Sequence, residues 1–116
     1  MKTSQFGAEV RHESGVAVLE LSGDVSAAAE GSLQLTYGEV ASEPVVVLDF
    51  AAVDYINSTG IALIVQLLAR ARAEHRAVAA GGLSDHYRQI FEITRISDFM
   101  TILDAANDTT DQEGKQ

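Results

Sequence analysis

Residues 54–60 are the most informative segment for chemistry, because D-Y-I-N-S-T-G places two hydroxyl side chains, Ser58 and Thr59, at the start of an expected helix. The first turn of a helix leaves backbone N–H groups without partners. One explanation is a plain N-cap, in which Asn57, Ser58 or Thr59 accepts a hydrogen bond from such a group. The other is phosphorylation, since the same N–H groups and the helix dipole stabilise an added charge of about −1.5 to −2. A phosphate beside an apolar helix face would disfavour a docked partner, so this corner of the molecule could act as a switch.

Evidence for catalysis is weaker. Asp49 and Asp54 flank the end of an expected strand, where open α/β sheets place function, so a phosphoryl-accepting aspartate is an alternative. That chemistry needs a lysine, and the two lysines, Lys2 and Lys115, lie at the ends of the chain. The three histidines lack metal-binding spacing, and the chain has no cysteine, nucleotide-binding glycine motif or nucleophile elbow. We therefore expect no enzyme, no metal site and no cofactor on this chain.

Length and charge narrow the class of protein. The 116 residues suffice for one domain, and 47% of them are hydrophobic, enough for a proper core. Seventeen acidic residues against eight basic ones give a net charge of −9, which argues against nucleic acid and anionic membranes as partners. The longest apolar stretch, 61–69, is far shorter than the roughly 20 residues that cross a bilayer. With no signal-peptide pattern at the N-terminus, we expect a cytoplasmic protein without direct membrane insertion.

Strand and helix periods alternate along the chain and predict an α/β fold. We expect a single domain over 1–104, with a central mixed β-sheet of four to five strands and helices packed against it, followed by a polar, disordered tail over 105–116. The run 45–50 is typical of a strand buried on both faces, and 51–57 is expected to be a loop. Ser26 is the expected N-cap of the first helix. The expected strands are 9–13, 16–21, 45–50, 77–80 and about 100–103, and the expected helices are 25–42, 58–75 and one opened by Ser84.

The helix at 58–75 has more apolar residues than one face needs. Its expected core stripe is Ile61, Ile64, Val65 and Leu68. Leu63 and Leu67 form a second apolar face, so the helix is either deeply buried or offers a surface to a partner.

Three segments together resemble the STAS domain, a family named for sulfate transporters and anti-sigma factor antagonists. The run V-V-V-L-D-F-x-x-V-D-Y-I-N-S-T-G-I-A-L-I-V carries the main resemblance. V-A-V-L-E-L-S-G-D-V-S is similar to the family's preceding strand, and S-D-H-Y-R-Q-I-F-E-I-T-R-I is similar to its third-helix segment. The resemblance covers about residues 10–104.

This resemblance implies a small, non-enzymatic α/β domain of bacterial transcription regulation and stress response. Stand-alone members bind an anti-sigma factor that is also a serine kinase, and they free the sigma factor until phosphorylation of one serine reverses the binding. Carried over, the phosphorylated residue is Ser58, with Thr59 as second choice. ATP and magnesium would belong to the partner kinase. The partner-binding residues implied are Asp24, Ser26, Asn57, Thr59, Gly60, Ile61 and Leu63.

Three positions depart from the family pattern. Asn57 stands where the family usually has aspartate before the phosphorylated serine, and Ser26 stands at a second acidic position. Both changes remove negative charge from the corner, so we expect less efficient phosphorylation. Arg95 stands where many members have a helix-ending glycine.

Two other functions within the family are alternatives. One is a STAS accessory subunit that binds the ATPase of a lipid-transport ABC system, since G-I-A-L-I-V-Q-L-L resembles those subunits and they need no phosphorylation. The other is a ligand-sensing or stressosome-type scaffold module, which higher oligomers would favour. We expect a monomer or weak homodimer.

Overall fold

Strands and helices alternate after an initial hairpin, as the hydrophobic periods predict. The computed structural model describes residues 4–40 and 43–103. The predicted α/β class, with a mixed sheet and packed helices, is confirmed. The polar tail predicted at 105–116 lies outside the described residues. In chain order the elements are β1 (Gly7–Glu13), β2 (Val16–Val25), η1 (Ala27–Ala29), α1 (Glu30–Gly38), β3 (Val45–Ile56), α2 (Ser58–Ala73), β4 (Ala77–Gly81), α3 (Asp85–Ile93), η2 (Ile96–Phe99) and β5 (Thr101–Ile102).

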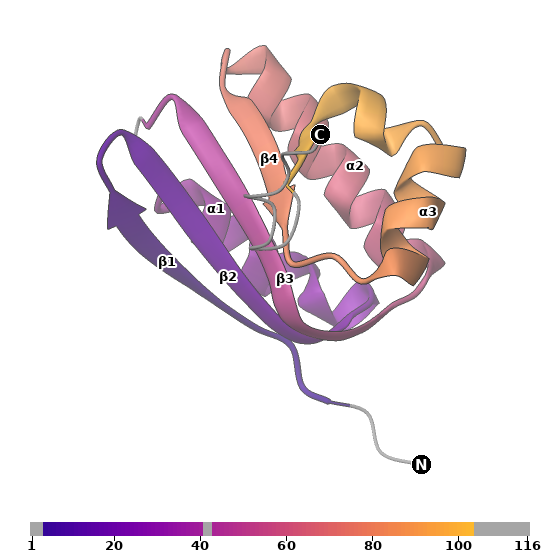
Figure 1. Ribbon diagram of the computed structural model, residues 1–116. Coiled ribbons are helices and arrows are strands. Elements are labelled where there is room, and N and C mark those ends of the chain that lie inside the picture. The colour runs from indigo at the N-terminus through magenta and orange to yellow at the C-terminus, as the bar shows by residue number, and fades with distance from the viewer. Residues whose placement is uncertain (1–3, 41–42, 104–116) are drawn as a thin grey trace.

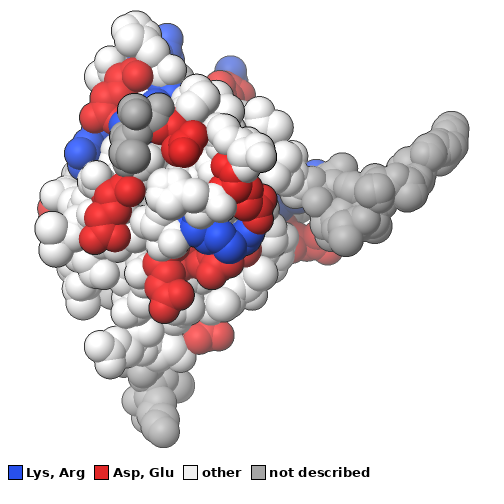
Figure 2. Space-filling model, turned by 90° about the vertical axis from the view of Figure 1, so that its left-hand side faces the viewer, with Lys and Arg blue, Asp and Glu red and all other residues white. Residues whose placement is uncertain are grey.

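The five strands lie side by side in sequence order. β1 is antiparallel to β2, and the other neighbouring strands are parallel. Parallel connections are almost always right-handed, and here each one steps in the same direction across the sheet. The connecting helices therefore lie on the same face, and Figure 1 shows α1 and α2 together behind the sheet, with α3 beside α2. The side of the molecule that carries β1 displays more acidic than basic side chains (Figure 2).

β3 differs from its prediction in burial and in length. Val46, Leu48 and Phe50 are buried under the helices, whereas Val45 and Val47 are only partly buried. A strand buried on both faces was therefore the wrong expectation, because no described helix covers the second face. The predicted loop over 51–57 is also wrong: β3 continues through residue 56, since β2 pairs with it as far as residue 25.

The first helix starts later than predicted. Ser26 has an extended backbone (φ −143°, ψ −170°) and its side chain makes no capping hydrogen bond. The chain then passes through the short 3₁₀ turn η1 before α1 begins at Glu30. Ser26 as the cap of a long helix is therefore corrected: the backbone stays extended for one residue after β2, and the helix begins later.

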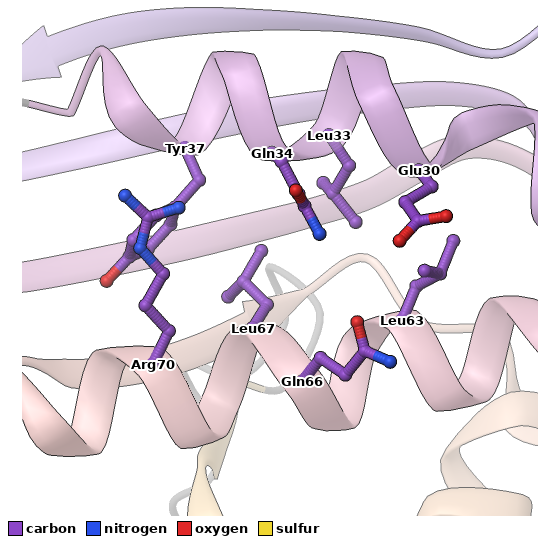
Figure 3. A pocket seen from close by; sticks show the side chains of 8 residues that line it. All are labelled: Glu30, Leu33, Gln34, Tyr37, Leu63, Gln66, Leu67 and Arg70. Atoms are coloured by element: carbon purple, nitrogen blue, oxygen red, sulfur yellow. The ribbon is translucent and has the colours of Figure 1, made fainter.

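α2 packs against two neighbours, the sheet and α1. Leu63 and Leu67 are each only 6% exposed and point toward α1 (Figure 3). Val65, predicted in the core stripe, is 45% exposed, and Ile61 is only partly buried. The prediction failed here because one hydrophobic stripe assumes a single neighbour, whereas α1 covers a second side of the helix.

Tyr37 fastens α1 to the C-terminal end of α2. Its buried hydroxyl donates a 2.9 Å hydrogen bond to the Glu74 carboxylate. The guanidinium carbons of Arg70 and Arg76 lie 4.6 Å and 5.4 Å from the centroid of the Tyr37 ring, a cation–π arrangement. Burial, and then the hydrogen bond to Glu74, raises the pKa of Tyr37, and the same hydrogen bond is the main cause of a lowered pKa at Glu74.

Candidate functional site

The register of β2 and β3 brings together the two segments that carry the predicted site. Asp24 lies opposite Tyr55, and Val25 lies opposite Ile56, at the carboxyl ends of two parallel strands. The residues that follow β2 and β3 therefore leave the sheet at the same edge, where open α/β sheets place function. We call Asp24, Ser26, Asn57, Ser58 and Thr59 the switch corner.

Backbone contact fixes the amino end of α2 at this corner. The Asn57 N–H donates a 3.2 Å hydrogen bond to the Val25 carbonyl oxygen. Gly60 is buried one turn further on, and a Cβ atom there would lie 2.0 Å from the same oxygen. Only glycine permits this approach, so Gly60 acts in positioning the corner.

Asn57 is the N-cap of α2. Its Oδ1 accepts a 2.8 Å hydrogen bond from the Gly60 N–H, and its backbone is extended (φ −93°, ψ −177°). Ser58 and Thr59 are exposed. Neither hydroxyl forms a hydrogen bond within the described residues, 4–40 and 43–103. Of the three capping candidates, the structure assigns the cap to Asn57, which leaves the Ser58 hydroxyl without a structural task in the described part of the chain.

Asp24 anchors the segment that precedes β1. Its Oδ2 accepts a 3.3 Å hydrogen bond from the Ser4 N–H, and its N–H donates to the Ser4 carbonyl oxygen at 3.0 Å. Gly23, beside it, has φ +77°, and a Cβ there would lie 2.1 Å from the Gln5 carbonyl oxygen. Asp24 is thus held in place by a glycine-dependent close approach.

A hollow of about 560 Å³ opens between these segments. Asp24, Ser26 and Asn57 line it, together with the half-exposed ring of Tyr55. No lysine or arginine is among the described residues that line it, so its formal charge is negative. Sequence reasoning missed Tyr55 because it assigned residues 51–57 to a loop; the side-to-side alternation of a longer strand could have found it.

Two of the predicted partner-binding residues, Ile61 and Leu63, differ in burial. Ile61 is partly buried against the core, and Leu63 lies at the base of the groove between α1 and α2. The side chain of Leu63 is therefore core and is not displayed at the switch corner. The remaining predicted residues come together there, with Gly60 beneath them.

The structure places Asp49, the candidate for phosphoryl acceptance, beside the backbone that follows it. The Asp49 Oδ1 accepts a 2.9 Å hydrogen bond from the Ala51 N–H, a local structural role. No group of three or more His, Asp or Glu side chains within 4–40 and 43–103 is placed to hold a metal ion. None of the helices in that part of the chain is long and apolar enough to cross a membrane.

Comparison with known proteins agrees with this geometry. Residues 8–104 match the family described as "Mlab, STAS domain". An anti-sigma factor antagonist from Mycobacterium paratuberculosis has a similar structure, with a TM-score of 0.75, 20% identity and 90% of each chain covered. SpoIIAA, an anti-sigma factor antagonist, is similar in its unphosphorylated form (TM-score 0.64, 15% identity, covering 87% of this chain and 89% of that one). The phosphorylated form of Bacillus SpoIIAA gives a TM-score of 0.65 at 14% identity, covering 88% and 94%.

At these identities the solved structures establish a common fold. A search of curated protein sequences found no match. The family model, however, spans most of the chain, including both segments of the switch corner. The chain belongs to the STAS domain family.

Proposed function

We propose that this protein is an anti-sigma factor antagonist that binds an anti-sigma factor with serine kinase activity through the switch corner. Phosphorylation of Ser58 would end the binding and so regulate sigma-factor-dependent transcription, in the cytoplasm. The similar fold of three anti-sigma factor antagonist structures supports the general role. ATP and magnesium would be bound by the partner.

The observation that carries the proposal is that Asn57, and not Ser58, caps α2. Asn57 supplies the capping oxygen to Gly60, so the exposed Ser58 hydroxyl is available to a kinase without loss of the cap. A phosphate on Ser58 would sit at the positive end of the α2 dipole, which stabilises the modified state.

The negative hollow explains how a phosphate could act on a partner. Asp24 lines this hollow without a lysine or arginine among the other described lining residues. A phosphate beside it would increase the like charge at the corner, and a partner surface would have to desolvate it. The bound complex would therefore be weakened, while the fold itself would be preserved.

The test is affinity capture from a lysate of the source bacterium with three immobilised proteins: wild type, Ser58→Ala and Ser58→Asp. We expect wild type and Ser58→Ala to retain a protein with an ATP-binding serine kinase domain, and Ser58→Asp to lose it. Incubation of the captured complex with ATP and magnesium should place phosphate on wild-type Ser58, as peptide mass spectrometry would show.

Ser14→Asp is the matched control, because Ser14 is exposed in the β1–β2 turn at the opposite end of β2. It adds the same charge and should retain the partner. Equal retention of the kinase by Ser58→Asp would contradict the switch.

A second function, an accessory subunit on the ATPase of an ABC transport system, is favoured by one observation. Asn57 is uncharged and its side-chain oxygen is occupied by the cap, so it gives no negative charge to a phosphorylation reaction at Ser58. In that case the captured protein would be an ABC ATPase, retained equally by all four proteins.

A further inference from the structure

An apolar groove runs along the side of α2 that faces away from α1. Its volume is about 330 Å³, and its apolar walls are Val65, Leu68 and Ala69 of α2 with Ile96 and Phe99 of η2. Val65 and Phe99 are 45% and 56% exposed, so the walls reach outward into solvent. A small ligand at the floor would leave these outer surfaces uncovered, whereas a helix laid in the groove would cover them.

The groove is basic on a molecule that is otherwise acidic. α2 contains no acidic residue in its 16 positions, although the whole chain has a net charge of −9. Arg72 stands at one end of the groove, with its guanidinium carbon 5.8 Å from the centroid of the Phe99 ring. It forms no ion pair with any residue of the described ranges, so its charge is available to a carboxylate from outside.

Arg95 adds a second cation to the rim. It has φ +68°, a left-handed conformation that favours glycine, and it is held by a 2.7 Å ion pair with Asp98. This conformation is the usual one for the residue that follows the C-cap of a helix, here α3, so the contribution of Arg95 to the rim is its charge and its position.

Spacing along α2 gives the length of the groove wall. Val65, Leu68, Ala69 and Arg72 stand at i, i+3, i+4 and i+7, one side of a helix over two turns, or about 10 Å. An amphipathic helix with apolar side chains at the same spacing would fit beside them.

We propose that this groove, which we call the α2–η2 groove, binds an amphipathic helix of a partner protein through apolar anchors and an acidic side chain that pairs with Arg72. The surface is separate from the switch corner and does not depend on phosphorylation of Ser58. A second copy of this chain is a poorer occupant, because two molecules of net charge −9 repel each other.

The test uses the ¹⁵N-labelled full chain and two capped, alanine-based helical peptides of about 14 residues. Both carry leucines at i, i+3, i+4 and i+7; one ends in glutamates and the other in lysines. We expect the glutamate peptide to shift the amide signals of Val65, Ala69 and Phe99 in a saturable manner, and the lysine peptide to bind about tenfold more weakly.

Charge reversal then identifies the contact. Arg72→Glu should weaken binding of the glutamate peptide about tenfold. It should restore binding of the lysine peptide, since the ion pair is rebuilt with opposite signs. Leu35→Asp, on an exposed position of α1, is the matched control and should change neither affinity. Ser58→Asp should also leave both affinities unchanged, so failure of this proposal is distinguishable from failure of the Ser58 switch.

The proposal is overturned if the glutamate peptide shifts no groove signals, or if the two peptides bind Arg72→Glu and wild type alike. It is also overturned if the groove signals move with protein concentration alone, since a second copy would then be the occupant.

Discussion

The two ends of α2 are held in opposite ways. At the amino end, backbone meets backbone: the Val25 carbonyl oxygen receives the Asn57 N–H and approaches Gly60 too closely for any side chain. At the carboxyl end, side chains make the contacts, with Tyr37 hydrogen-bonded to Glu74 and flanked by arginines. The backbone contacts leave the amino end of α2 little freedom to move. The hold on the carboxyl end depends on side-chain packing and charge.

This difference suits the two proposed surfaces. A switch needs its modified residue in a reproducible place with its own side chain unused, and the backbone contacts at the amino end supply both. A docking groove needs exposed apolar walls and an available charge. Val65 and Arg72 of α2 supply these, together with Phe99 of η2.

The largest effect should come from Gly60→Ala, which tests the backbone contact. The new Cβ would lie 2.0 Å from the Val25 carbonyl oxygen, so α2 or β2 must shift. We expect a loss of about 3 kcal/mol in the free energy of unfolding, measured by urea denaturation. Gly31→Ala is the control: nothing lies within 4 Å of its Cβ position in α1, and it should stabilise the protein by about 0.5 kcal/mol. Equal effects of the two variants would show that the amino end is not tightly packed.

Tyr37→Phe tests the side-chain contact at the other end. It removes the 2.9 Å hydrogen bond to Glu74 and keeps the ring beside both arginines. We expect a loss of about 1.5 kcal/mol in urea denaturation, because a buried hydroxyl bonded to a charged group is worth that much. Tyr55→Phe, which alters a half-exposed ring, should change stability by less than about 0.5 kcal/mol.

Asn57 caps α2 with an uncharged side chain, so two substitutions at this position can change the cap and the charge separately. Asn57→Ala removes the oxygen that accepts from Gly60 and should lower stability by about 1 kcal/mol. Asn57→Asp keeps the cap and adds a negative charge at the positive end of the dipole, so we expect a gain of about 0.5 kcal/mol in thermal unfolding. A loss in Asn57→Asp as large as in Asn57→Ala would mean that the side chain does more than cap.

The smallest effect should be a pH dependence at the carboxyl end. The hydrogen bond from Tyr37 lowers the pKa of Glu74 from its ordinary 4.5. A carboxyl group of this kind stabilises the fold above its unfolded pKa, and that contribution is lost as pH falls through the lower, folded value. Wild type should therefore lose stability below about pH 4.5, and Tyr37→Phe, which lacks the main cause, should lose less over the same interval. Parallel pH curves for the two proteins would contradict this assignment.

Local signals predicted much of the fold. The valine-rich run of β3 and the alternation in β2 marked strands, because β-branched residues favour a pleated surface wherever it lies. Ser84 marked the start of α3, where its hydroxyl oxygen accepts from the Tyr87 N–H, since capping depends on residues within one turn. The position of Ser58 at a helix start was predicted for the same reason.

Non-local contacts decided what the sequence left open or predicted incorrectly. β3 extends to Ile56 because β2 continues beside it, and Leu63 is core because α1 covers it. The start of α2 is held at the end of β2 by the contacts of Asn57 and Gly60 with the Val25 carbonyl oxygen, between segments far apart in the chain. The sequence by itself determined the order of strands and helices and the hydroxyls at the start of α2, because propensity and capping act over a few residues. Only the tertiary structure decided that the start of α2 meets the end of β2 and where the apolar groove opens, because both depend on what packs against α2.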